Sequence, residues 1–281
     1  MPNGIIIIDK PAGWTSMDVC AKLRGVFHEK RVGHGGTLDP MATGVLPVFV
    51  GRATRAVEFA ENGRKEYLAG LRLGVTTDTQ DVTGTVLETR PVAAGREDLE
   101  AALERFRGEI EQIPPMYSAV KIQGKKLYEL ARRGKEVERK PRPVTIHELE
   151  LLEAESETDF RLRCLCSKGT YIRTLCHDIG QALDCGGTLY SLRRTMAAGF
   201  TLADAVTLEE VREQGEALLW PLDSLFAGYP AVTLRSPGQE KRVRSGAPVT
   251  LPGTADGTYR VYGREGDFLC LSRAVGGELK S

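Results

Sequence analysis

The sequence predicts an α+β protein with two domains, a large one over residues 1–228 and a small β-rich one over residues 229–281. Length is the first reason, because 281 residues exceed the roughly 100–200 of one typical domain. The second is that strand-like and helix-like segments alternate through most of the chain. The third is a change near "FAGYPAVTL", beyond which short strand-like segments are separated by Gly, Pro and Asp.

The N-terminal part begins with a strand and a helix. Four consecutive isoleucines predict a buried strand over Gly4–Ile8. Thr15-Ser16-Met17-Asp18 has the pattern of a capping box, so we expect a helix from there to about Phe27. "GVLPVFVG", residues 44–51, predicts a second buried strand, and the alternation of "KEYLAGLRLGV", residues 65–75, predicts a third.

Further elements follow a polar turn, "TTDTQDVTG", over residues 76–84. Apolar residues at helical spacing predict an amphipathic helix over residues 96–110. Alternation of apolar residues with arginines predicts a half-buried strand over Phe160–Cys166. Beyond it, residues 171–183 have the apolar stripe of another helix.

Charge is uneven along the chain although its total is balanced, with 38 basic and 38 acidic residues. Residues 121–142 hold nine Lys or Arg and three Glu, and residues 148–159 then hold six acids. The basic run is either a solvated surface or an arm that contacts phosphates, since Lys and Arg supply most of the affinity for nucleic acids. The residues that would form such an arm are Lys121, Lys125, Lys126, Arg132 and Arg133.

The six cysteines are expected to be free thiols in the core. They lack the paired C-x-x-C spacing of a zinc site, and a chain of this size needs no disulfide framework. Cys176, His177 and Cys185 do not suggest a metal site, because adjacent residues on one helix point in different directions. Free thiols, the absence of a targeting segment and the absence of an apolar run of eighteen residues predict a cytoplasmic protein.

The segment "GHGGTLDPMATGVLPV", residues 33–48, has the glycines and prolines of a rigid, irregular loop. It lacks the Gly-Lys-Ser/Thr of a P-loop and the spacing of a dinucleotide-binding motif. Its carboxylate, Asp39, either makes a turn before Pro40 or is held there for chemistry. Composition alone leaves both interpretations open.

This loop and several other motifs resemble those of the TruB family of tRNA pseudouridine synthases. The other motifs occur in family order and are "GIIIIDKPAGWTS", "KEYLAGLRLGVTTDTQDVTG", "QIPPMYSAVKIQGKKLYELARRG", "CSKGTYIRTLCHDIG" and "LYSLRR". The resemblance covers roughly residues 4–195. It implies a catalytic domain built on a mostly antiparallel sheet with flanking helices, and a C-terminal PUA-like RNA-binding domain.

The resemblance also implies a reaction, in which the N1–C1′ bond of a uridine is cleaved, the base is turned, and it is rejoined through C5. The nucleotide must be flipped out of the RNA stack to be reached. A carboxylate must be held at the sugar or at the pyrimidine ring, and the sequence does not decide between these two positions. No cofactor and no metal are required.

Residue by residue, the resemblance implies that Asp39 is the nucleophile. Tyr67 matches the aromatic residue that stacks on the uracil and assists removal of the C5 proton, and Arg173 matches the arginine that pairs with the carboxylate. Without the resemblance, Tyr67 would be a half-buried strand tyrosine and Arg173 a surface helix arginine. The residues that match positions lining the uridine site are His34, Tyr171 and Leu192. Lys10 is expected to support the loop.

The resemblance implies tRNA as the partner, gripped at its T arm by the basic segment Lys121–Arg142, with uridine 55 of the T loop as the target. We expect a monomer that needs no protein partner and no guide RNA. Two alternatives remain at this stage. One is a guide-dependent member of the superfamily within a multiprotein particle. The other is a protein that folds or binds RNA and whose catalysis is incidental.

Overall fold

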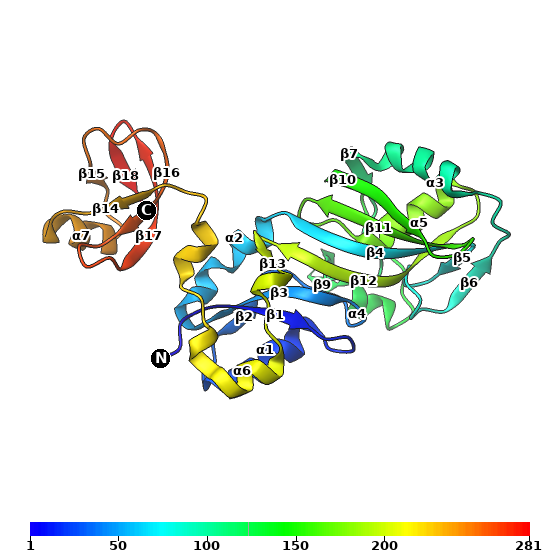
Figure 1. Ribbon diagram of the computed structural model, residues 1–281, viewed down its shortest axis with the longest axis horizontal. Coiled ribbons are helices and arrows are strands. Elements are labelled where there is room, and N and C mark those ends of the chain that lie inside the picture. The colour runs from blue at the N-terminus through cyan, green and yellow to red at the C-terminus, as the bar shows by residue number, and fades with distance from the viewer. Residues whose placement is uncertain (123) are drawn as a thin grey trace. The chain divides into compact units, whose positions relative to one another are not determined.

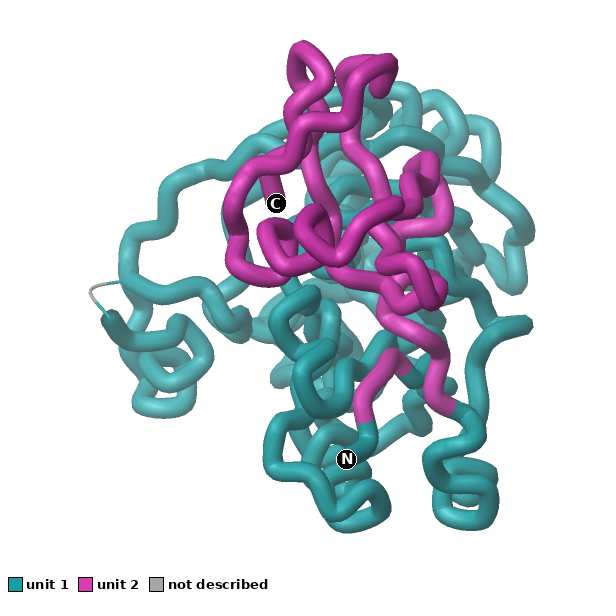
Figure 2. The backbone as a smooth tube through the Cα atoms, turned by 90° about the vertical axis from the view of Figure 1, so that its left-hand side faces the viewer, with its two compact units in different colours: residues 1–2, 6–218 teal, residues 3–5, 219–281 magenta. Residues whose placement is uncertain are grey.

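The computed structural model describes residues 1–122 and 124–281 and divides into two compact units. Unit 1 comprises Met1–Pro2 and Ile6–Leu218, and unit 2 comprises Asn3–Ile5 and Leu219–Ser281 (Figure 2). The division comes after Leu218, somewhat before the boundary at residue 228 that the sequence suggested. The assignment of the two parts as catalytic and RNA-binding domains stays a prediction.

A large mixed sheet forms the centre of unit 1 (Figure 1). Its described strands run in the order β1-β3-β12-β4-β11-β10-β7, with β2 paired to β3 and β13 paired to β12. Their bounds are β1 Gly4–Lys10, β2 Val32–His34, β3 Thr43–Val50, β4 Lys65–Leu73, β7 Gly108–Gln112, β10 Arg142–Ala154, β11 Asp159–Cys166, β12 Gly187–Ala197 and β13 Phe200–Thr201. From β12 through β4, β11 and β10 to β7 every neighbouring pair is antiparallel, whereas β12 and β3 are parallel. The expected mixed, mostly antiparallel sheet is confirmed.

Short helices flank this sheet. The α-helices of unit 1 are α1 Ser16–Phe27, α2 Val57–Asn62, α3 Arg96–Leu103, α4 Leu127–Ala131, α5 Ile172–Ala182 and α6 Leu208–Gln214. Two small hairpins lie outside the sheet, β5 Val75–Thr77 with β6 Val86–Thr89 and β8 Lys121–Ile122 with β9 Lys125–Lys126. The capping box that Thr15 and Asp18 predicted is present at the start of α1.

The helix predicted over residues 96–110 is wrong in its second half. The α-helix ends at Leu103, a 3₁₀ turn covers Glu104–Phe106, and Gly108–Gln112 forms the edge strand β7. Gly108 has φ of 83°, a left-handed value that a helix interior does not allow. Pairing of β7 with β10 then satisfies backbone groups that a longer helix would have bonded internally.

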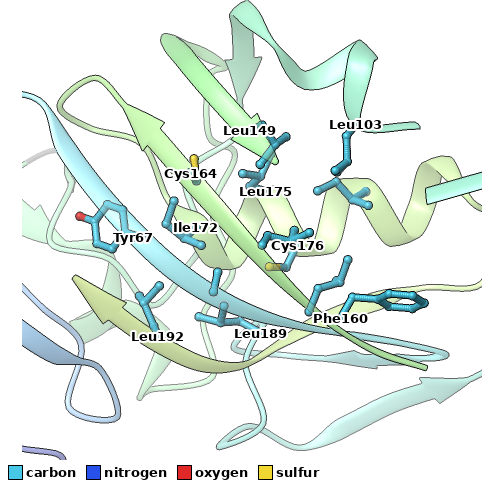
Figure 3. Packing of buried hydrophobic residues seen from close by; sticks show 14 of the residues in the cluster. Tyr67, Leu103, Leu149, Phe160, Cys164, Ile172, Leu175, Cys176, Leu189 and Leu192 are labelled. Carbon is cyan, nitrogen blue, oxygen red and sulfur yellow. The ribbon is translucent and has the colours of Figure 1, made fainter. Parts of the chain in front are cut away.

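One apolar core of unit 1 lies between β4, β10, β11, β12 and the helices α3 and α5. Figure 3 shows it as one cluster with Phe160 toward one end and with Tyr67 and Leu192 at the other. Cys164 and Cys176 are buried within it. All six cysteines are free thiols, and five of them are buried as expected, whereas Cys270 is only half-buried. The apolar packing thus continues up to two residues that the sequence placed in a uridine site.

Unit 2 is a small β-rich body, as expected. Its described strands run in the order β14-β16-β17-β18-β15, with bounds β14 Ala231–Thr233, β15 Val249–Thr250, β16 Gly257–Tyr262, β17 Phe268–Val275 and β18 Glu278–Lys280. The sequence analysis missed its helix α7, Pro237–Arg244, although Ser236 followed by Pro237 is a recognisable helix start. Val243 of α7 packs with Val261 and Leu279 in a separate small core.

Helix α5 lies unusually close to β12 because two glycines face each other. A Cβ built on Gly180 would overlap the backbone of Gly187, and one built on Gly187 would overlap the Cys176 carbonyl. This close approach fixes the position of α5 against the sheet, and α5 carries Arg173 near its first turn.

Replacement of the helix glycine tests this packing. Gly180→Ala is expected to destabilise the protein by about 1–3 kcal/mol, because the methyl group has no room without a shift of the helix. The matched control is Gly25→Ala in α1, where a Cβ meets nothing within 4 Å and alanine should stabilise by about 0.5–1 kcal/mol. Denaturant unfolding of both variants measures the difference, and equal effects would contradict the close packing of α5.

Candidate active site

The glycine-rich loop between β2 and β3 is anchored by bonds from distant parts of the chain. Ser16 Oγ accepts a hydrogen bond from Leu38 N at 2.9 Å and lies 3.3 Å from Leu38 O. The carbonyl of Pro40 accepts from Gly13 N at 2.8 Å and from Lys10 Nζ at 3.3 Å. These bonds hold the backbone on both sides of Asp39, so the carboxylate stands on a fixed support. Lys10 supports the loop through its bond to Pro40 O, as expected from the sequence.

A second anchor is the contact between the loop and β12. Gly44 has φ of 100°, and a Cβ there would overlap the carbonyl oxygen of Arg194. Glycine is therefore required at this position for two independent reasons, its backbone angle and its lack of a side chain. The parallel pairing of Arg194 with Gly44 depends on this close approach.

The Asp39 carboxylate contacts a side chain far away in sequence. Arg173 Nε donates to Asp39 Oδ2 at 2.8 Å, and Arg173 Nη2 donates to Asp39 Oδ1 at 3.3 Å. Asp39 is 35% exposed while Arg173 is 4% exposed. A buried guanidinium thus orients a carboxylate that solvent, and hence a ligand, can still reach.

The same guanidinium is held by two further segments of backbone. Arg173 Nη1 donates to Thr79 O at 2.8 Å, and Nη2 donates to Tyr117 O at 2.7 Å. Asp81 lies 3.8 Å from Arg173 Nε and is itself fixed by hydrogen bonds from Thr79 and Thr83. Arg173 therefore connects the Asp39 loop, the 76–84 turn and the segment before the basic run.

Tyr67 and Leu192 lie on adjacent strands of the large sheet. Tyr67 belongs to β4, and β12 pairs with it so that Leu192 faces Ala69 and Arg194 faces Tyr67. Both Tyr67 and Leu192 are buried at the same end of the core cluster (Figure 3). Leu38, the residue before Asp39, belongs to the same cluster. Register and packing bring together residues that the sequence had placed in separate motifs.

His34 and Tyr171 come from elements on either side of the loop. His34 ends β2, opposite Val48, and its Nδ1 has no hydrogen-bond partner among the described residues. Tyr171 is the N-cap residue of α5, two positions before Arg173. The Gln112 side chain accepts from Tyr171 N at 3.0 Å and donates to Tyr171 O at 3.2 Å, which fixes the start of the helix.

Burial sets the protonation of several groups near the site. It raises the pKa of Tyr67 to about 12, against the opposing charge and hydrogen bond of Arg194. Burial, together with the charge of Arg194, lowers the pKa of His34, which favours a neutral imidazole at pH 7. Burial also lowers the pKa of Lys10 to about 8, while the Asp39 carboxylate acts in the opposite direction.

The five arm residues belong to β8 and β9 or directly follow α4 in unit 1. Lys121, Lys125, Arg132 and Arg133 are exposed and Lys126 is half-buried, while Gln123 within the segment lies outside the described residues. Lys126 and Arg132 lie 5.5 and 5.4 Å from the ring centre of Tyr128. The arm is linked to the site at its base, because Tyr117 bonds to Arg173 and Tyr128 N bonds to Ser118 O.

Sequence reasoning missed three residues of this site, namely Asp81, Gln112 and Arg194. Asp81 belongs to the polar turn of residues 76–84, and a buried carboxylate in a turn carries no signal of its partner. Gln112 and Arg194 act on backbone groups of other segments, which a sequence pattern does not reveal. All three side chains are buried, which only the folded chain reveals.

The described ranges show no group of three or more His, Cys, Asp or Glu side chains that could hold a metal ion. Across the same residues, no helix is long and apolar enough to cross a membrane. The chemical resources of the site are thus an oriented carboxylate, a buried arginine, a tyrosine and apolar side chains. Such a set suits nucleophilic or electrostatic action on a flat, flipped base.

Two family models match consecutive parts of the chain. The model described as TruB family pseudouridylate synthase (N terminal domain) matches residues 24–172. The model described as tRNA pseudouridylate synthase B C-terminal domain matches residues 173–227. Together they span Asp39, Tyr67, Arg173 and Leu192.

Several curated proteins are similar over nearly their whole length. The tRNA pseudouridine synthase B of Azoarcus sp. (strain BH72) is 46% identical over 282 residues, covering 99% of this chain and 93% of the relative. That of Pseudomonas syringae pv. syringae (strain B728a) is 47% identical, covering 97% and 92%. Among solved structures, a chain of a Cbf5-Nop10-Gar1 complex is 28% identical with a TM-score of 0.73, covering 97% of this chain and 78% of that chain.

The helix that carries Arg173 also carries a carboxyl with a perturbed pKa. Burial raises the pKa of Asp178 from 3.8 to about 6. At pH values between 3.8 and 6 this carboxyl binds more protons in the folded chain than in the unfolded chain. Its burial therefore costs little stability at low pH and opposes folding increasingly as the pH rises through 6.

Asp178→Asn is therefore expected to stabilise the protein at pH 7.5 by about 1–2 kcal/mol, a value reduced for partial exposure, and to have little effect near pH 4. Thermal unfolding of wild type and variant at both pH values measures this change. A variant less stable than wild type at pH 7.5 would show that the carboxylate has a favourable role that burial does not capture.

Proposed function

The chain belongs to the TruB family of pseudouridine synthases, and from that premise we propose that it isomerises uridine 55 in the T loop of tRNA to pseudouridine without a guide RNA. A pseudouridine synthase is an isomerase, and the relatives of this chain are named tRNA pseudouridine synthase B. The observation that carries the proposal is the Asp39–Arg173 pair, a reachable carboxylate fixed by a buried arginine. A cytoplasmic location, where tRNA is found, goes with this function.

In this proposal Asp39 is the nucleophile. Its attack, at C1′ of the sugar or at the pyrimidine ring, allows the N1–C1′ bond to break while the base stays bound. The base turns, the C5–C1′ bond forms and the bond to Asp39 breaks, which regenerates the carboxylate. C5 loses its proton and N1 gains one, so the product is an isomer of the substrate. The rigid loop supports this role, because reacting atoms must be held within about half an ångström.

The neighbouring residues have complementary roles in the proposal. Arg173 orients Asp39 and does not need to move, since its other donors are already bound to backbone carbonyls. Tyr67 stacks on the uracil and assists removal of the C5 proton. His34, Tyr171 and Leu192 line the space that a flipped uridine would occupy.

Recognition of tRNA is assigned to the basic arm of residues 121–142. Lys and Arg that contact phosphates position the RNA, while a pocket reads the splayed base of a loop. Exposure of Lys121, Lys125 and Arg132 supports contact with a backbone. The bond from Arg173 to the Tyr117 carbonyl connects the base of the arm to the site. This connection supports a function in which the arm that binds the tRNA stem is held in place relative to the residues that act on the base.

A guide-dependent function is the alternative closest to the proposal. It is favoured by the likeness to a chain of an H/ACA RNP bound to a substrate RNA, which is 26% identical with a TM-score of 0.71. The higher identity of the tRNA pseudouridine synthase B relatives, 44% to 51%, favours stand-alone action on tRNA. Activity of the isolated protein on a T-arm hairpin, with no other RNA or protein present, would decide between them.

Asp39→Asn tests the proposed nucleophile. Pseudouridine formation is expected to be lost while tRNA binding stays within about threefold of wild type, because the amide keeps the shape of the side chain but is neutral and a poor nucleophile. Mapping of pseudouridine in tRNA incubated with purified protein measures the product. Product made by the variant above the level of an enzyme-free control would remove Asp39 from this role.

Charge reversal in the arm tests RNA recognition. Lys125→Glu with Lys126→Glu, or Arg132→Glu with Arg133→Glu, should weaken tRNA binding and reduce its salt dependence, since each lost phosphate contact lowers the slope by roughly 0.7–0.9. The matched control is Arg105→Glu with Arg212→Glu, two exposed arginines outside the arm. Binding titrations at several salt concentrations give the slopes. If all three pairs show the same slope, the arm is a solvated surface.

A further inference from the structure

Arg194 is a large charged side chain with no exposure to solvent. Its accessible fraction is 0%, and it lies on β12 two residues after Leu192. Among the described residues its hydrogen bonds end on the backbone carbonyls of Gly36, Thr37 and Val45, none of which is a carboxylate. Burial of a cation without a counter-charge is costly, so the fold retains it at the expense of stability.

The carbonyls that accept from Arg194 lie on both sides of Asp39. Nη2 donates to Gly36 O at 3.1 Å and Nη1 to Thr37 O at 3.4 Å, before the carboxylate in the chain. Nε donates to Val45 O at 2.7 Å, after it. One planar group therefore joins the entrance and the exit of the loop that presents Asp39.

The same side chain lies next to Tyr67. Antiparallel pairing of β12 with β4 places Arg194 directly opposite Tyr67, and side chains at such positions project from the same face. The adjacent Arg193 projects from the other face, where it forms a two-point ion pair with Asp9. Arg194 thus bonds to the loop of the proposed nucleophile and lies beside the aromatic residue proposed to assist removal of the C5 proton, whose pKa its charge lowers.

We propose that Arg194 is a positioning residue that sets the Asp39 loop and the Tyr67 ring relative to each other for the reaction on uridine. The proposal rests on the proposed function. Only arginine fits this task, because its five donors lie in a rigid fork that can reach several carbonyls at once. A lysine would supply the charge at one point and leave loop carbonyls without a partner.

Arg194→Lys is the principal test, and Arg193→Lys is its matched control on the opposite face. The Arg194 variant is expected to lose about 100-fold or more in single-turnover rate at saturating tRNA, since small displacements of reacting groups cost about that much. Its dissociation constant for tRNA should stay within about threefold of wild type. The Arg193 variant should keep the wild-type rate, and an Arg194 variant that also keeps it would overturn the proposal.

A deuterium isotope effect at C5 of the target uridine separates positioning of Tyr67 from support of the loop alone. Misplacement of Tyr67 slows removal of the C5 proton, so Arg194→Lys should show a larger C5 isotope effect than wild type. A slow variant with the wild-type isotope effect would overturn the proposal, because Arg194 would then act on the loop alone.

Hydrogen exchange of the folded proteins gives a readout that does not depend on activity. Amides of residues 36–45 should exchange faster in Arg194→Lys than in wild type or in Arg193→Lys, while β4 and β11 keep their protection. Unchanged exchange in this loop would overturn the positioning role even if the wild-type protein proved inactive on tRNA. Inactive wild-type protein with faster loop exchange in the variant would reject the proposed function and retain Arg194 as the residue that holds the loop.

Discussion

The ion pair between Arg173 and Asp39 is the interaction on which the rest of the site depends. Its two partners are separated by 134 residues, so it forms only when α5 is packed against the sheet and the loop is closed. The guanidinium is buried and acts as a fixed support, while the half-exposed carboxylate can still be reached by a ligand. A buried arginine needs partners for its donors, and the carbonyls of Thr79 and Tyr117 accept from its two Nη atoms.

Much of the remaining structure serves to prevent this pair from moving. The glycine contact between α5 and β12 fixes the helix, and the Gln112 amide fixes its first turn. On the other side, Lys10 and Arg194 hold the loop by its backbone carbonyls. Interiors are packed at the density of organic crystals, so groups tied to the core at several points have little freedom left. The site is rigid because its supports come from different elements.

The structure also bears on the two interpretations of Asp39 that composition left open. A carboxylate that only makes a turn bonds to backbone groups near it in sequence, whereas both oxygens of Asp39 accept from a distant arginine. The match to TruB family models supplies the chemistry that such a pair would serve. Guide-free action and the choice of uridine rest on the arm and on the tRNA named in the relatives.

The sequence by itself determined the α+β class, most strands and helices, the small β-rich C-terminal part and the membership of a family. Periodicity and capping residues act over a few positions, so they can be read locally, as at Thr15 and Asp18. They failed after Leu103, where pairing with β10 turned a predicted helix into a strand. The family resemblance implied that Arg173 pairs with the carboxylate, but only the tertiary structure decided that the guanidinium is buried and bound to two backbone carbonyls, and that Arg194 lies between the loop and Tyr67. Such contacts depend on strand register and on the approach of α5 to β12, and these are set by packing between segments that are distant in sequence.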